Sequence, residues 1–196
     1  MDNKLVFWIE TINTWVGKAF GWCILLLTAA TSYEVFARYA LGAPTEWAFD
    51  AAYILYGTLF MMAGAYTLAR NGHVRGDWIY RNWKPTTQAK SDLILYFVFF
   101  FPGIVTMFYV GWDYAAYSWS VKERSLFTPA GPIIYPFKTI IPIAGAMMIA
   151  QGIAEVLRCI YCIQNGNWPP RLGDVEELEQ VLQKQYGAEG ANGEKA

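Results

Sequence analysis

The single histidine of the chain, His73, lies in the stretch ARNGHVRGDW between Arg70 and Arg75, shortly before Asp77. A histidine there could serve as an acid–base catalyst, a metal ligand or a charged anchor at a membrane surface. Haem held by two histidines and a zinc site built on several are excluded, because the chain has no second histidine. No nucleophile motif such as G-x-S-x-G accompanies His73, so anchoring is the favoured interpretation.

The residues around His73 predict a turn that ends an apolar helix. The Asn-Gly pair before the histidine is a helix stop, because glycine tolerates the left-handed conformation that closes a helix. Arg70, His73 and Arg75 then lie where lipid phosphates and helix-end carbonyls are available, and Asp77 can pair locally or cap the segment DWIYRNW. We interpret these four residues as a lipid-headgroup or subunit-interface site.

A second group of charged residues lies at the other end of the same apolar region. Glu34 and Arg38 are four residues apart, with Glu on the N-terminal side, which is the favourable order for an ion pair within one helix. Two arrangements are open: a self-neutralising pair at the headgroup level, or Arg38 reaching across the LGAPT turn to Glu46 or Asp50. Either way, the four residues are predicted to form a structural or subunit-interface cluster.

The cysteines give no sign of a metal or cofactor site. Cys159 and Cys162 form a C-x-x-C pair within a predicted helix, but there is no second pair. We interpret them, and Cys23, as small buried apolar residues. No cofactor is predicted.

The composition predicts an all-α integral membrane protein. Of 196 residues, 55% are hydrophobic and only 16% charged, and a net charge of -1 argues against a nucleic-acid partner. A bilayer core requires about 20 mostly apolar residues per helix. Four stretches meet this requirement: residues 16–37, 48–68, 93–112 and 137–163, which together form a membrane domain over 16–163.

Two flanking segments complete the predicted organisation. Residues 1–15 place apolar side chains at spacings of three and four, which predicts an amphipathic helix lying in the membrane interface. Residues 164–196 begin with the helix-breaking stretch QNGNWPPRLGD and continue as a polar, acidic and partly disordered tail. The loop between the second and third predicted helices is rich in Lys and Arg, so it and both termini are predicted to be cytoplasmic.

Small residues recur at four-residue spacing in the first and fourth predicted helices, and such stripes suit close helix contacts: Gly17, Gly21, Ala146, Ala150 and Ala154. Gln151 and Glu155 lie on or beside the second stripe, and Glu155 can pair with Arg158. The contacts could be internal or to another subunit.

Two stretches, EVFARYALGAPTEWAFDAA and FMMAGAYTLARNGHVRGDW, are similar to the small membrane subunit, DctQ type, of tripartite ATP-independent periplasmic (TRAP) transporters. In that family an Arg-Tyr pair ends the first membrane helix, a Trp/Glu turn begins the second, and a Gly-Ala…Arg…Gly-His-Val-Arg pattern closes it. The matching residues here are Arg38-Tyr39, Glu46-Trp47, Gly64-Ala65, Arg70 and Gly72-His73-Val74-Arg75. The stretch VKERSLFTPAGPIIYPFK and the acidic tail depart from the family pattern.

The resemblance implies a complex in the bacterial inner membrane, in which a periplasmic binding protein delivers an organic acid to a large permease that couples uptake to sodium. The small subunit is then a scaffold beside the permease, bound to membrane lipids, and carries no substrate itself. A self-sufficient carrier would place polar groups at mid-membrane on broken helices. It is disfavoured, because the polar residues cluster at helix ends and the clear interior break is Pro102-Gly103 in the aromatic-rich third predicted helix. The alternatives are an independent small transporter and a small membrane enzyme or haem protein with a polar site at Glu34, Arg38 and Asp50.

Overall fold

The computed structural model describes residues 4–72, 80, 82–129, 131–169 and 171, and within them all regular structure is helical apart from one isolated bridge between Arg124 and Ile133. The elements are α1 (Lys4–Gly21), α2 (Cys23–Ala40), α3 (Ala48–Ala69), α5 (Pro85–Leu95), the π-helical segment η1 (Tyr96–Phe100), α6 (Phe101–Ser120), α7 (Tyr135–Lys138) and α8 (Ile140–Asn165).

Four helical runs of the described residues are long and apolar enough to cross a membrane. The first joins α1 to α2 through a tightened turn at Trp22, and the third joins α5, η1 and α6. The first run covers most of what the sequence predicted as two separate helices, 1–15 and 16–37, and the third extends beyond the predicted 93–112 because the helix continues through polar residues. The 37 residues of the first run span about 55 Å, well beyond the ~30 Å of a bilayer core.

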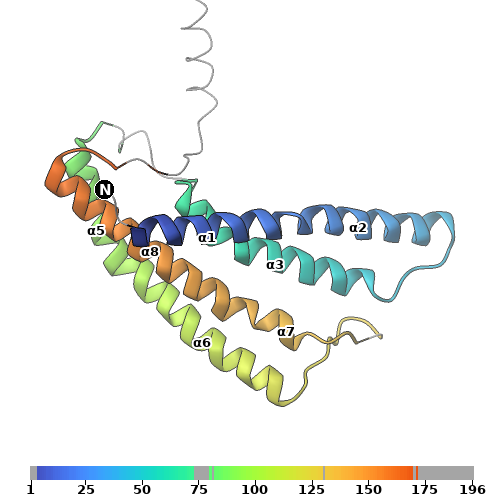
Figure 1. Ribbon diagram of the computed structural model, residues 1–196. Coiled ribbons are helices and arrows are strands. Elements are labelled where there is room, and N and C mark those ends of the chain that lie inside the picture. The colour runs from blue at the N-terminus through green and yellow to red at the C-terminus, as the bar shows by residue number, and fades with distance from the viewer. Residues whose placement is uncertain (1–3, 73–79, 81, 130, 170, 172–196) are drawn as a thin grey trace, which may run out of the picture.

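The helices form two diverging layers (Figure 1). In one layer α1 and α2 lie end to end and α3 runs back beside them. In the other layer α6 and α8 lie side by side, and α5 packs on the C-terminal part of α8. The layers meet where α1 and α3 contact α8, and they separate toward α2 and α7.

Helix α1 has the polar face and the apolar face that its sequence predicts, but the polar face is the one that packs against the rest of the protein. Its polar residues Glu10 and Asn13 are buried against α8, whereas Leu5, Trp8 and Trp15 are exposed. An apolar outer face with a polar inner face suits a helix surrounded by lipid on one side and protein on the other. The placement of residues 1–15 in the membrane interface stays a prediction.

A π-helical turn adapts the third run to α8. The Phe101 N–H donates to the Tyr96 carbonyl, five residues back, just before Pro102, whose nitrogen has no hydrogen to donate. The turn sets Phe100 against Gly152 of α8, where an added Cβ would lie 2.5 Å from Cε1 of the Phe100 ring. The close packing of the two helices therefore requires a residue without a side chain at 152.

We expect Gly152→Val to lower the stability of the chain by about 1–3 kcal/mol, because the new side chain overlaps the Phe100 ring. Thermal unfolding in mild detergent measures the loss. The control is Gly103→Ala, whose Cβ would meet nothing within 4 Å and which gains helix propensity, so its stability should stay equal or rise. Equal melting temperatures for Gly152→Val and the wild type would contradict the packing argument.

Candidate functional site

The first candidate site is a set of buried polar side chains near the two ends of the described chain, here called the terminal network: Glu10, Asn13, Gln151, Glu155, Arg158 and Arg171. Its centre is an ion pair between α1 and α8. Arg158 donates to one carboxylate oxygen of Glu10 through Nε, at 2.8 Å, and through an Nη. Only 5% of the Arg158 side chain and 3% of the Glu10 side chain are exposed.

A second ion pair brings the segment after α8 back to the bundle. Arg171 donates through both Nη atoms to the two oxygens of Glu155, at 2.9 and 2.8 Å, and also to the carbonyl of Ala69 at the end of α3. Arg158 lies 4.0 Å from the same Glu155 carboxylate. Two carboxylates and two guanidinium groups thus neutralise one another, which is the condition for burying charge at low cost.

Two amides connect the ion pairs to the rest of α1. Asn13 donates to the side-chain oxygen of Gln151 at 2.8 Å, and Gln151 donates to Glu155 at 3.1 Å. Because each buried group has a partner, the network avoids the large cost of an unpaired buried charge. The sequence pointed to Glu155 and Arg158, but the bidentate partner of Glu155 is Arg171, which sequence analysis missed together with Glu10 and Asn13.

We expect Arg158→Met to destabilise the chain by about 3–5 kcal/mol, because it leaves the Glu10 carboxylate buried without its partner. Arg38→Met is the matched control: its ion pair is with Glu34 and its side chain is 54% exposed, so the expected loss is about 0–1 kcal/mol. Unfolding in mild detergent compares the two variants.

A double-mutant cycle isolates the ion pair from the packing of its members. Glu10→Gln together with Arg158→Gln should cost less than the sum of the single changes, since the pair is removed without a charge left behind. Strictly additive losses would show that the two side chains do not depend on each other.

The second candidate site, here called the loop cluster, lies where α3 begins: Asp50, Ser118, Glu123, Ser125, Thr128 and Lys138. The carboxylate of Asp50 is buried in the first turn of α3, and it accepts hydrogen bonds from the hydroxyls of Ser125 and Thr128. Phe127 packs edge-on against Phe49 beside it. Asp50 therefore fastens the segment between α6 and α7 onto α3, a contact between residues 75 and 78 positions apart.

The other half of the loop cluster is an ion pair. Lys138 donates to Glu123, which also accepts from the Ser118 hydroxyl at 2.7 Å. The Lys138 ammonium lies 3.9 Å from the centre of the Tyr114 ring, a cation–π contact. The hydrogen bond from Lys138, with a second from Ser118, lowers the pKa of Glu123 below its ordinary value of 4.5.

The lowered pKa of Glu123 predicts a pH dependence of stability. A carboxylate with a depressed pKa in the folded protein contributes stability above pH 4.5, and the contribution is lost as the pH falls through the lowered value. We expect Glu123→Gln to be less stable than the wild type at pH 7, by about 1 kcal/mol or less, with the difference closing below pH 4.5.

Melting temperatures from pH 7 down to pH 3 measure this difference. The control variant Glu46→Gln changes an exposed carboxylate and should follow the wild type throughout. A difference between Glu123→Gln and the wild type that persists unchanged at pH 3 would contradict the assignment.

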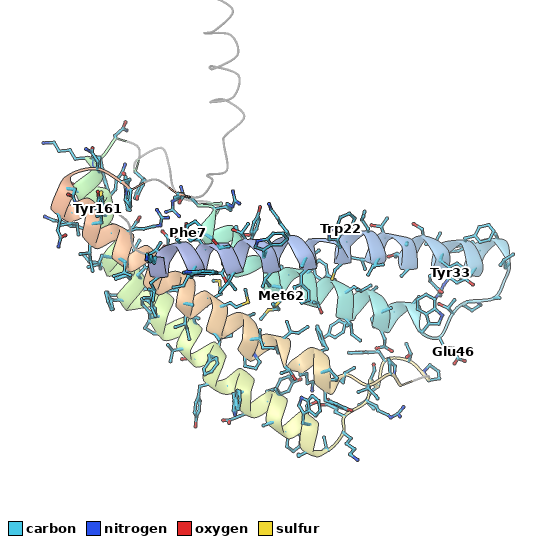
Figure 2. All side chains as sticks on the ribbon, viewed as in Figure 1. Phe7, Trp22, Tyr33, Glu46, Met62 and Tyr161 are labelled. Atoms are coloured by element: carbon cyan, nitrogen blue, oxygen red, sulfur yellow. The ribbon has the colours of Figure 1, made fainter. Side chains whose placement is uncertain are left out.

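Glu34 and Arg38 form the pair within one helix that was the first of the two arrangements considered. Arg38 donates to Glu34 at 2.8 Å through Nε, and the other Glu34 oxygen accepts from the backbone N–H and the hydroxyl of Thr45. Among the described residues Arg38 makes no ion pair with Glu46 or Asp50. Figure 2 shows Glu46 in the turn after α2, directed away from the helices.

The site predicted around the histidine is only partly described. His73, Arg75 and Asp77 lie outside the described residues. Arg70 is half-buried at the end of α3, its guanidinium carbon 5.6 Å from the centre of the Tyr66 ring. Its role as a headgroup or interface residue stays a prediction.

The predicted packing residues lie in different surroundings. Gly17 faces α3 so closely that an added Cβ would lie 2.4 Å from Cβ of Tyr66, whereas a Cβ at Gly21 would meet nothing within 4 Å. Along α8, Ala154 is buried, Ala150 half-buried and Ala146 exposed. Internal contact thus accounts for Gly17 and Ala154, and packing at Gly21 and Ala146 would need another molecule.

The cysteine pair of α8 lies in an apolar cluster. Cys159 and Cys162 are buried beside Ala89 and Tyr96. Over the part of the chain that the structure describes, no group of three His, Cys, Asp or Glu side chains could hold a metal ion.

Comparison with known families assigns the chain. A sequence model of the DctQ component of tripartite ATP-independent periplasmic transporters matches residues 27–161, more than half of the chain. The chain belongs to the DctQ family. A comparison with curated proteins found no match. DctQ proteins are transporter components and not an enzyme family, and together with four apolar helical runs this makes the chain a multi-pass membrane component of a TRAP system.

The DctQ match covers the loop cluster and only part of the terminal network. It begins within α2 and ends within α8, so Asp50, Glu123, Lys138, Glu155 and Arg158 lie inside it. The partners that complete the network lie outside: Glu10, Asn13 and Arg171. Residues outside the matched region therefore contribute one member of each of two ion pairs, Glu10–Arg158 and Glu155–Arg171.

Proposed function

We propose that this DctQ component is a scaffold subunit, which packs beside a large permease and does not itself carry substrate. The strongest support is that its buried carboxylates are already bonded to other residues of the chain. Glu10 and Glu155 are each held by an arginine, and Asp50 is held by two hydroxyls. Groups committed to internal partners hold the bundle together and are not free to bind a solute.

Two grooves between the helices also support the scaffold proposal. A carrier is expected to place polar groups at mid-membrane, usually on broken helices. One groove of the described chain, between α6 and α8, is lined by apolar side chains such as Phe108, Trp112 and Ile143, and a second, between α3 and α6, is also predominantly apolar. Neither groove has a charged side chain among its lining residues, so neither is built to hold the carboxylate of an organic acid.

Helix α2 provides the surface on which we place the permease. It packs mainly on α3, and large apolar side chains cover its outer side: Ile24, Leu25, Leu26, Val35 and Phe36. Gly21 adjoins this surface and has open space beside it. A glycine on an apolar helix face allows a neighbouring membrane helix to approach closely.

In the proposed complex, a periplasmic binding protein delivers an organic acid to the large permease, which couples uptake to sodium in a bacterial inner membrane. The Lys- and Arg-rich segment after α3 favours both termini in the cytoplasm. The loop cluster then faces the periplasm and the terminal network faces the cytoplasm. A small membrane enzyme or haem protein is the less favoured alternative, because its proposed polar site near Arg38 is occupied by the contacts of Glu34 with Thr45 and Arg38.

The scaffold proposal predicts that Gly21→Phe separates assembly from folding. The new ring enters open space in the chain itself, so the melting temperature should stay near the wild-type value, but it would clash with a permease helix packed on α2. We expect recovery of the large permease with the tagged chain to fall about tenfold or more, and uptake in vesicles to fall with it.

Gly103→Phe is the matched control, since Gly103 also has open space beside it but lies on α6. It should leave recovery of the permease unchanged. Mass spectrometry of the proteins that copurify with the tagged chain provides the measurement. Recovery of the folded wild-type chain alone, from cells that also express its genomic neighbours, would overturn the proposal.

A further inference from the structure

The second apolar groove, here called the three-helix groove, is a candidate lipid site. Its walls are α3 and α6 and its floor is α8, with Tyr56, Ala63, Gly64, Thr67, Met107 and Met148 among the lining residues. Its volume of about 530 Å³ lies within the range of ~300–1,000 Å³ that is typical of ligand pockets. Methionine side chains are flexible enough to fit an irregular hydrocarbon chain.

The length of the groove matches one half of a bilayer. From Tyr56 to Thr67, α3 rises about 16 Å, and half of a hydrocarbon core is about 15 Å. The Thr67 hydroxyl donates to the Ala63 carbonyl at 2.9 Å, so it needs no hydrogen-bond partner from a molecule bound in the groove. The groove thus extends from the middle of α3 to its C-terminal end.

A cation follows the groove at the C-terminal end of α3. Arg70 follows Thr67 by one helical turn, and its Nε is buried with no hydrogen-bond partner among the described residues. The guanidinium lies over the Tyr66 ring, a contact that gives the Nε–H no hydrogen-bond acceptor. A phosphate group offers several oxygens in the geometry that arginine binds best. Basic residues between membrane helices often bind the headgroups of anionic lipids.

We propose that the three-helix groove and Arg70 together bind one anionic glycerophospholipid, with an acyl chain in the groove and the phosphate at the guanidinium. A bare hydrocarbon chain or an apolar helix would fill the groove but would leave Arg70 without an acceptor. The lipid comes from the leaflet on the Arg70 side, which the proposed topology makes cytoplasmic. The site itself does not depend on the scaffold function.

Native mass spectrometry of the full-length chain tests the site. The chain is equilibrated in detergent with equal amounts of phosphatidylglycerol and phosphatidylcholine that carry identical acyl chains. We expect wild-type chains to retain about fivefold more phosphatidylglycerol than phosphatidylcholine. Arg70→Gln should lower this ratio to about one, whereas Lys90→Gln, which removes an exposed cation of α5, should leave it unchanged.

The acyl part of the site is tested by filling the groove. Ala63→Phe should abolish retention of both lipids, and Met107→Trp, which fills the groove from α6, gives a second test if the first variant fails to fold. Ala29→Phe, at an exposed position of α2, is the control and should retain lipid as the wild type does.

Three results would overturn the proposal: equal retention of the two lipids by the wild type, wild-type retention by folded groove-filling variants, or crosslinking of Gly64→Cys to another polypeptide in the membrane. Because binding is scored on the chain alone, a failure here is distinct from a failure to associate with the permease.

Discussion

The buried ion pair between Glu10 and Arg158 is the constraint on which the arrangement of the helices depends. An unpaired charge that is buried to this extent would be costly, so α1 can lie against α8 only in the register that joins the two side chains. The hydrogen bond between Asn13 and Gln151 fixes the same register one turn further along α1. Replacing a buried pair by apolar residues can preserve stability, so the main contribution of this pair is to specify one alignment of two otherwise apolar helices.

Different interactions hold the helices together at the two ends of the bundle. At one end, charge pairs connect α1, α3 and α8 through side chains that are almost fully buried, and the two layers are in contact. At the other end, Asp50 holds a surface segment by hydroxyl groups, and α2 packs mainly on α3. The divergence of the layers in Figure 1 follows from this difference. It leaves apolar surface on α2 and an apolar groove between α3 and α6, both directed at lipid or at a neighbouring subunit.

Local pattern was sufficient to predict the helices and to give the pair between Glu34 and Arg38 as one of two arrangements, because both depend on residues within a few turns of one another. The family also followed from short motifs around Arg38 and Arg70, and the match to residues 27–161 confirmed it. The terminal network could not be predicted in the same way. Periodicity shows that α1 has a polar face, but not whether water or another helix covers it. Arg171 follows paired prolines, and nothing local indicates that the chain there turns back to Glu155.

The separation of Glu10 and Arg158 by 148 residues also constrains the order of biosynthesis. At about 5–20 residues per second, a ribosome needs about 7–30 s to add the arginine after the glutamate has been made. During that interval the glutamate must stay hydrated, since its counterion does not yet exist. The N-terminal helix therefore reaches its final position only after the last membrane helix has been synthesised, and the bundle is completed from its two chain ends together.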